Sequence, residues 1–413
     1  MKPKILILAG FVLILLLLPL AELVAAPTVL RVWKGPHTSD DAAVFSKVIK
    51  DFEATHPNVQ IEFTSTPWDT INEKYTTAFA SGNPPDIFYG FTGGYVDGVV
   101  GKCWDFRKLF SKSEFDQLKK GVADSLLQET TVDGKLISIP WTTAGSGFVY
   151  NIDILKKAGF TTPPDTIADL LRYAKAMTGN GTYGYGQLSY DTGEAKPEFF
   201  LFAYGCTLLN DSMTEIGYDK AEGLAAFKLI DQLWNKDKSA VPVGLYPGTT
   251  MTDAFFSGKF AMMVTHSQIG AHLKDYPGFK LGVSSLPKGP GTALAGGRGT
   301  YAGSGFWCVA EGGKNSNIAK QFVQYLYQPK YQGPIAKAFS FIPSSTETKI
   351  EMDENSKAFA AAYLNYGVPY RFSAHLNEVK QAVWRAMQAL QSGAIGPEEA
   401  WKQAVSEGKA ALQ

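Results

Sequence analysis

The sequence predicts an α/β protein built from two lobes. Its 413 residues exceed the roughly 250 to 300 residues at which single hydrophobic cores stop growing. Residues 29–33 form a short apolar run typical of a strand, a helical pattern follows, and apolar residues alternate with polar ones at 59–63. Strand, helix and strand in this order indicate a βαβ unit with a parallel sheet.

The N-terminal residues have the features of a secretory signal peptide. Lys2 and Lys4 precede an apolar run at 5–20, and small residues follow at 24–26. We expect residues 1–26 to be removed; because Pro27 disfavours cleavage after residue 26, cleavage after 25 and an uncleaved anchor are alternatives. No cysteine follows the run to carry a lipid, and no later stretch approaches the ~20 apolar residues that cross a bilayer. The mature protein is expected to be soluble.

The next elements follow from periodicity and from helix start and stop signals. The first helix covers 44–52, and a second is predicted to begin with Thr66 as cap and Pro67 at the first helical position. Gly82 ends this helix, and the two prolines after it turn the chain into a third strand at 87–89.

Beyond residue 130 the α/β pattern repeats. A hairpin is predicted at 132–140, and glycine and proline between 287 and 305 indicate a segment that crosses between lobes. Further strands are predicted at 148–150, 260–264, 281–283 and 306–310. Further helices are predicted at 166–177, 199–204, 224–234, 252–256, 319–327, 379–390 and 397–412.

Composition and missing motifs argue against several classes of protein. Basic and acidic residues number 39 each, with no basic stripe, so nucleic acid is not an expected partner. We find no His-Glu-x-x-His zinc motif, no phosphate-binding Gly-Lys-Ser/Thr loop and no nucleophile elbow, so no metal or cofactor is expected. A glycosidase needs two carboxylates about 5 to 10 Å apart, and Asp40 and Asp97 make no convincing pair. The sequence therefore predicts a protein that is not an enzyme.

The three cysteines are far apart and match no metal-binding spacing. We interpret Cys103, Cys206 and Cys308 as three buried apolar residues. A disulfide within one pair is the alternative in an oxidising compartment, and the sequence does not choose the pair.

Five segments carry a resemblance to a known family. They are SGNPPDIF at 81–88, DGKLISIPWTTAGSGFVYNIDIL at 133–155, FFSGKFAMMV at 255–264, IAKQFVQYL at 318–326 and SGAIGPEEA at 392–400. In order and spacing they resemble extracellular solute-binding protein family 1, the ABC-importer proteins that include maltose- and oligosaccharide-binding proteins.

The resemblance implies a periplasmic-binding-protein-like fold, in which two α/β lobes are joined by a multi-crossing hinge with a ligand cleft between them. The first lobe would comprise 27–143 and 303–343, and the second would comprise 144–302 and 344–413. The chain would cross between lobes at 142–145, at 297–305 and near 341–345, and few torsions at such glycine-rich crossings can absorb a closure motion.

Ligands of open α/β sheets bind beyond the carboxyl ends of the strands, so the loops after five predicted strands should line the cleft. Their polar and aromatic residues include His37, Ser39, Trp68, Phe91, Tyr95, Trp141, His266 and Gln268. Aromatic faces suit the C–H faces of a sugar ring, and fixed donors and acceptors suit its hydroxyls. By alignment, the resemblance adds Tyr190, Arg371, Tyr301, Gly303 and Ser304, the last three through backbone N–H groups at the hinge. The alternatives are that Trp68 packs on the core and that His266 is structural.

Two departures from the maltose-binding proteins concern the ligand. Gly90, Gly93 and Gly94 stand where those proteins carry an aromatic platform and an acidic–basic pair, and Gln268 aligns with a second platform. The resemblance therefore does not imply maltodextrin.

As a whole, the resemblance implies the periplasmic or otherwise extracytoplasmic binding component of an ABC importer. Such a protein would act as a monomer, capture a mono- or oligosaccharide in the cleft and deliver it to the membrane permease subunits. A glycerol phosphate or another small polar solute, a secreted carbohydrate-active enzyme and a sugar-binding module without a transporter are the alternatives. The sequence leaves the sugar and its number of units open.

Overall fold

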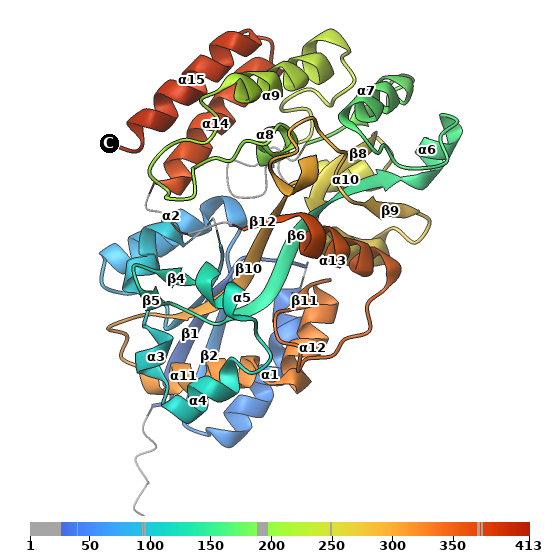
Figure 1. Ribbon diagram of the computed structural model, residues 1–413. Helices are drawn as coiled ribbons and strands as arrows, with labels where there is room; N and C mark the ends of the chain where they lie inside the picture. Colours follow the sequence, from blue (N-terminus) through green and yellow to red (C-terminus); the bar gives the residue numbers. More distant parts are fainter. Residues whose placement is uncertain are drawn as a thin grey trace, which may run out of the picture.

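The computed structural model describes residues 26–38, 40–92, 94, 96–187, 197–247, 250–369, 372 and 375–413. Two groups of helices lie at opposite ends of two long strands that run through the middle of the molecule (Figure 1). The predicted signal peptide at 1–26 lies almost wholly outside the described residues. No described helix is long and apolar enough to cross a membrane.

The first part of the chain forms the lower group of elements in Figure 1. It contains β1 (Thr28–Lys34), α1 (Asp41–Thr55), β2 (Val59–Ser65), α2 (Trp68–Ala80), β3 (Ile87–Phe91), a 3-10 helix (Asp97–Lys102), α3 (Phe106–Leu109), α4 (Lys112–Leu118), α5 (Asp124–Glu129), β4 (Thr131–Val132) and β5 (Lys135–Leu136). β1 pairs in parallel with β2 and with β3. The predicted βαβ unit is therefore confirmed, and β4 and β5 form the predicted hairpin.

The middle of the chain forms the upper group together with the C-terminal helices. It contains α6 (Ile152–Lys157), α7 (Ile167–Ala176), β7 (Tyr183–Tyr185), α8 (Pro197–Ala203), α9 (Ala221–Asp231) with a π-helical turn (Gln232–Lys236), α10 (Thr250–Phe256), β8 (Phe260–His266), a 3-10 helix (Ser267–Asp275), β9 (Leu281–Ser284) and a second 3-10 helix (Ala295–Gly297). α7 begins as the sequence predicts, with Thr166 and Asp169 forming a capping box.

Two strands connect the groups. β6 (Pro140–Asn151) and β10 (Thr300–Val309) run antiparallel to each other through the centre of the molecule. Over the described residues the hydrogen-bonded sheet is continuous, with the order β2-β1-β3-β10-β6-β8-β7. The segments predicted as crossings at 142–145 and 297–305 thus lie largely within extended strands.

The remaining elements return to both groups. α11 (Ser316–Leu326) and α12 (Pro329–Ala338) pack with the first group, β11 (Ile342–Pro343) pairs with β6, and β12 (Gly367–Pro369) pairs with β10. α13 (Glu354–Tyr366) packs along β6 and β9, and α14 (Leu376–Gln391) and α15 (Pro397–Ala410) pack on α9.

The start of α2 differs from the prediction. The helix begins at Trp68, and Pro67 is its N-cap, without a side-chain cap bond. The hydroxyl of Thr66 instead accepts a hydrogen bond from Lys74 Nζ at 2.8 Å, so it does not cap the helix. The end of α2 is as predicted, because Gly82 has a φ of +70°, a left-handed conformation that only glycine adopts without strain.

Two large hydrophobic clusters and a smaller third one form the cores. The first draws on residues between 30 and 141 and between 306 and 341, and the second draws mainly on residues between 148 and 286 and between 376 and 404. The cysteines divide between them: Cys103 and Cys308 lie in the first cluster and Cys206 lies in the second. All three are buried free thiols, in agreement with the interpretation as buried apolar residues.

Candidate ligand-binding site

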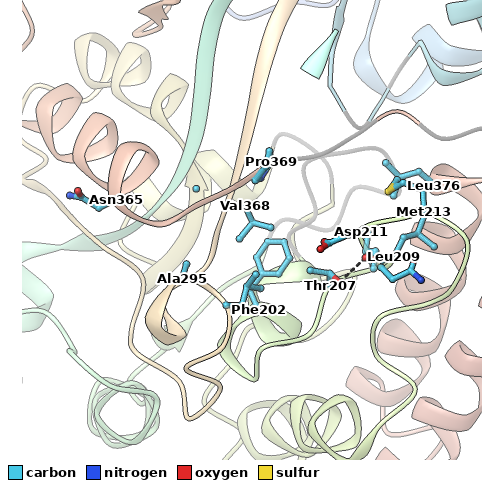
Figure 2. Close-up of a pocket in the computed structure, with 14 residues that line it drawn as sticks. Phe202, Thr207, Leu209, Asp211, Met213, Ala295, Asn365, Val368, Pro369 and Leu376 are labelled. Carbon is cyan, nitrogen blue, oxygen red and sulfur yellow. Dashed lines mark hydrogen bonds between the residues drawn. The ribbon is translucent and has the colours of Figure 1, made fainter. Parts of the chain in front are cut away.

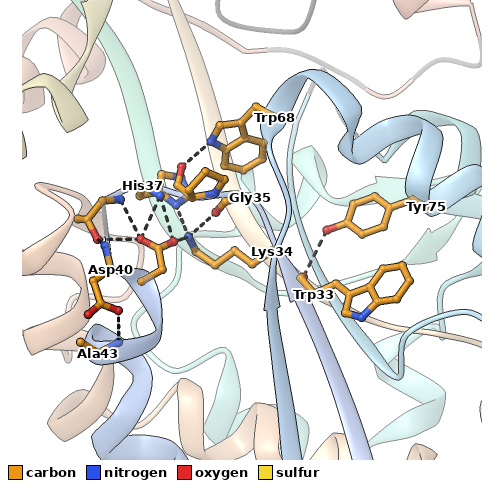
Figure 3. Close-up of polar contacts among 11 residues, drawn as sticks. Trp33, Lys34, Gly35, His37, Asp40, Ala43, Trp68 and Tyr75 are labelled. Carbon is orange, nitrogen blue, oxygen red and sulfur yellow. Dashed lines mark hydrogen bonds and ion pairs between the residues drawn. The ribbon is translucent and has the colours of Figure 1, made fainter. Parts of the chain in front are cut away.

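The loop after β1 is organised by a buried ion pair. Lys34 and Asp41 are both almost fully buried, and their side chains pair at 2.5 Å. The Asp41 carboxylate also accepts hydrogen bonds from the backbone N–H groups of His37, at 3.0 Å, and Thr38, at 2.8 Å (Figure 3). The loop is therefore tied to the first turn of α1 and holds His37 in one place.

His37 lies among aromatic rings of the first lobe. Its ring meets Trp68 and Phe91 edge-on, with centroid distances of 5.1 and 5.7 Å. Tyr89, Phe339 and Phe341 surround the rest of the ring at 4.7 to 5.6 Å. The indole N–H of Trp68 donates to the carbonyl oxygen of Pro36 at 2.5 Å, which holds this ring against the loop. Three sequence-predicted residues thus lie in one aromatic cluster, a wall of the candidate site, and Trp68 also packs against the first core, as the alternative interpretation expected.

Burial controls the charge states in this cluster. It lowers the pKa of Lys34 to about 8, although the charge of Asp41 and the hydrogen bond to it act in the opposite direction. Burial also lowers the pKa of His37 well below its ordinary 6.5, and the nearby Lys34 and His266 lower it further. His37 is therefore neutral near pH 7, and a histidine of the second lobe is close enough to affect it.

The second lobe contributes the end of β8 and the turn that follows. His266 meets the ring of Tyr301 edge-on at 5.4 Å, and its Nδ1 lies 3.5 Å from the Ser146 hydroxyl. In the same turn Ser267 Oγ and Gln268 Oε1 are buried and have no hydrogen-bond partner in the part of the chain that the structure describes. A buried polar atom without a hydrogen bond destabilises the folded protein, so these two atoms are candidates for hydrogen bonds to ligand hydroxyls.

The side chains of the predicted hinge residues Tyr301 and Ser304 point to opposite faces of β10. The hydroxyl of Tyr301 donates to the carbonyl oxygen of Thr92 at 2.5 Å, on the face that also meets His266. The side chain of Ser304 points the other way and donates to Glu129 Oε2 at 2.7 Å. The backbone N–H of Ser304 donates to Thr92 Oγ1 at 2.9 Å, so the expectation that it is available to a ligand is wrong. Gly303 leaves the space that the Tyr301 hydroxyl occupies.

The prediction that Trp141 lines the cleft is wrong. Its side chain is fully buried in the first core, and its indole N–H donates to the carbonyl oxygen of Leu326 at 2.8 Å. At this position β6 still runs inside the first lobe, between β10 and β11, so the side chain has a core on its face of the strand. Trp141 does not line a cleft.

Four predicted residues, Ser39, Tyr95, Tyr190 and Arg371, lie outside the described residues. The structure adds residues that sequence reasoning missed, chiefly Tyr89, Phe339 and Phe341 around His37. Phe339 and Phe341 follow α12, about 300 positions after His37 in the chain, and no local pattern connects them to the loop after β1.

A separate pocket of about 380 Å³ lies in the second lobe (Figure 2). Phe202, Leu209 and Val368 give it apolar walls, and Asn210 and Asp211 add polar groups. Its volume is within the range of small-molecule sites, but none of the sequence-predicted site residues that the structure describes lines it. In the described residues no group of three or more His, Cys, Asp or Glu side chains is arranged to hold a metal ion.

Two α/β groups joined by long strands, with His266 of one group close enough to His37 of the other to lower its pKa, define a two-lobe binding protein with a periplasmic-binding-protein-like fold. A family model described as bacterial extracellular solute-binding protein matches residues 47–361. The chain belongs to this family of extracellular binding proteins.

Known proteins of similar sequence and structure agree with this assignment. A binding protein of Brucella abortus (strain 2308) is 26% identical over 392 residues, which cover 93% of each chain. The diacetylchitobiose binding protein DasA of Streptomyces coelicolor is 25% identical over 361 residues, covering 81% of this chain and 77% of that protein. The structure of an ABC transporter solute-binding protein from Thermotoga lettingae, bound with α-D-tagatose, superposes with a TM-score of 0.81 at 22% identity, covering 94% of this chain and 100% of that one.

Proposed function

We propose that this protein is the binding component of an ABC importer and captures an uncharged carbohydrate between its two lobes. The observation that carries the proposal is the aromatic cluster of His37, Trp68 and Phe91 in one lobe, with His266 of the other lobe close enough to lower the pKa of His37. Gln268, two residues after His266, has a buried Oε1 without a hydrogen-bond partner among the described residues. Aromatic faces and fixed polar groups at one place suit a sugar ring and its hydroxyls. The named ligands of two relatives, diacetylchitobiose and tagatose, support the same class.

The lobe limits, partners and location form part of this proposal. The division into 27–143 with 303–343 and 144–302 with 344–413 is supported by the two hydrophobic clusters. We propose that the protein is a monomer, that the segment 1–26 exports it, and that it docks on membrane permease subunits; membership of the family of extracellular binding proteins supports the export and the docking. Of the residues left as candidates, Ser39, Tyr95, Tyr190 and Arg371 would complete the cleft.

We further propose that the protein binds its solute without transforming it. Glycoside hydrolysis requires two carboxylates about 5 to 10 Å apart that can reach the substrate. Asp41 is held by Lys34 and by two backbone N–H groups, and Asp40 caps α1 through the N–H of Ala43. Glu129 is bound to Ser304 on the other face of β10. None of these carboxylates is placed for catalysis beside His37.

A thermal-shift screen tests the class of solute. The panel holds diacetylchitobiose, maltose and tagatose as neutral sugars, glycerol 3-phosphate as an anion, and a set of amino acids. We expect one neutral sugar to bind with a dissociation constant on the order of 1 μM, or about 8 kcal/mol. At 100 times that constant it would stabilise the protein by about 2.7 kcal/mol. Stabilisation by glycerol phosphate or an amino acid alone would contradict the sugar assignment.

Two tryptophan variants make the screen specific to the site. Trp68→Ala should abolish most of the sugar-induced shift, because this ring belongs to the wall around His37. Trp104 is a half-buried tryptophan of the same lobe whose indole N–H donates to Ser316 Oγ. Trp104→Ala should lower the unfolding temperature of the free protein while leaving the sugar-induced shift intact.

A further inference from the structure

The hydrogen bonds of Lys34 determine which nitrogen of His37 carries the proton. A lysine ammonium group has three N–H donors and no acceptor. Lys34 Nζ contacts three acceptors: the carbonyl oxygen of Gly35 at 2.7 Å, the Asp41 carboxylate at 2.5 Å and Nδ1 of His37. All three donors are therefore used inside the loop, and Figure 3 shows them converging on the ammonium group.

Nδ1 of His37 must then act as an acceptor. In a neutral imidazole one nitrogen accepts and the other donates, so the proton of His37 lies on Nε2. This Nε2 is buried and has no hydrogen-bond partner among the residues that the structure describes. His37 as a whole is only 9% exposed. A buried donor without an acceptor is costly, and a bound solute can supply the missing oxygen.

We propose that Lys34 fixes His37 as the neutral Nε2–H tautomer, and that this N–H is a dedicated donor to an uncharged oxygen of the bound solute. Lys34 acts as a positioning residue, because it reaches the solute only through His37. The inference rests on the proposed function and deepens it by specifying what the solute must offer at this point: a hydroxyl, ether or carbonyl oxygen.

The charges around His37 support a neutral partner. Lys34 of β1 and Asp41 of α1 cancel each other as a buried pair. His266 of β8 and Lys34 both oppose protonation of His37, and Tyr89 of β3 presents its ring edge-on. The pKa of His37 is well below 6.5, mainly because the ring is buried. An ammonium group of a solute offers only N–H donors, and here they would face the Nε2–H donor of His37. An amine is therefore disfavoured beside His37.

Nitrogen NMR of the ligand-free protein tests the tautomer directly. Long-range proton–nitrogen spectra of the uniformly labelled protein resolve its five histidines, and His37→Gln identifies the signal of His37. We expect the Nε2–H pattern, unchanged between pH 5.5 and 7.5. An Nδ1–H pattern, or protonation of His37 within that range, would overturn the inference.

Removing Lys34 should release the tautomer. In Lys34→Met we expect a mixture of both tautomers and a His37 pKa above that of the wild type. Because Lys34→Met leaves the Asp41 charge buried alone, the double variant with Asp41→Asn provides the same test in a protein without that charge. A wild-type His37 pattern in the folded double variant would show that Lys34 does not position the ring.

Two substitutions at His37 test donation to the solute, with the neutral sugar that gives the largest shift in the panel as probe. His37→Asn keeps an acceptor for Lys34 and removes the Nε2 donor, so affinity should fall about tenfold or more. His37→Gln places an amide N–H near the position of Nε2 and should stay within about threefold of wild type. Equal losses in both variants would contradict donation from Nε2. If no sugar in the panel binds, the proposed function is contradicted. The NMR measurement needs no ligand, so it tests the tautomer of His37 independently of that result.

Discussion

Glu129 is the residue whose ionisation should matter most for stability at the hinge. Glu129 is 8% exposed as a whole residue, and its carboxyl group accepts one hydrogen bond, from the Ser304 hydroxyl at 2.7 Å. No lysine or arginine among the described residues forms an ion pair with it. Burial therefore raises the pKa of Glu129 to about 7, from an ordinary value of 4.5. Near neutral pH the ionised form of Glu129 therefore destabilises the folded protein.

The sign of the pH dependence follows from the raised pKa. Between about pH 4.5 and 7 the folded state retains a proton that the unfolded state has released, so the stability falls as the pH rises through this window. The loss amounts to about 3 kcal/mol when complete. Glu129→Gln keeps an acceptor for Ser304 and removes the charge, so it should stabilise the protein more at pH 8 than at pH 5 in urea unfolding. Glu62→Gln, at an exposed position of β2, is the control, and an equal gain for Glu129→Gln at both pH values would contradict the prediction.

Single residues show where sequence reasoning reached its limit. His37, Trp68 and Phe91 follow strand ends, and the rule for open α/β sheets predicts that they lie at one edge. Their rings do lie together in the structure, and their contact with a ligand stays a prediction. Trp141 also follows a predicted strand end, yet it is buried because β6 continues through that position for ten more residues. The tautomer of His37 depends on Lys34, the last residue of β1, and a sequence pattern does not predict that a lysine at a strand end is fully buried.

Among the elements, the strands β6 and β10 explain both a success and a failure of prediction. The glycine-rich segments are predicted as crossings between lobes, and in the structure they lie within the paired strands β6 and β10, which connect the two groups of elements. Their sequence pattern predicts loops, because glycine is unfavourable in the interior of a strand. In the structure glycine is required within the strand: a Cβ atom on Gly305 would lie 2.0 Å from the Tyr89 hydroxyl oxygen and 2.7 Å from Thr142 Oγ1.

Gly305→Ala should therefore destabilise the hinge region. Tyr89 is fully buried and cannot swing away, so the added methyl group must displace packed atoms at a cost of about 1–3 kcal/mol. Thermal unfolding measures this loss. Gly101→Ala is the matched control, because a Cβ atom there has no atom within 4 Å and the unfolding temperature should hardly change. A Gly305→Ala protein as stable as the control would mean that Tyr89 and Thr142 do not confine this part of β10.

For the whole molecule, length and motif order predicted two lobes, and of the three hydrophobic clusters one lies in the predicted first lobe and two lie in the predicted second lobe. The clusters share β6 and β10, so the lobes can move relative to each other only by bending or twisting these two strands and the shorter β11 and β12 paired with them. His266 of the second lobe is close enough to His37 of the first to lower its pKa.

A solute that binds His37 on one lobe and Gln268 on the other should shift the lobes toward a closed arrangement. Only a difference in affinity between the open and closed states can shift this population, and contacts to both lobes supply such a difference. Small-angle X-ray scattering should therefore show a smaller radius of gyration at saturating sugar than in the free protein. Trp68→Ala at the same sugar concentration should remain close to the free value, because its affinity is reduced. If calorimetry detected tight binding by the wild type while its scattering profile stayed unchanged, the sugar would occupy one lobe alone, and the pairing of His37 with Gln268 around a single solute would be wrong.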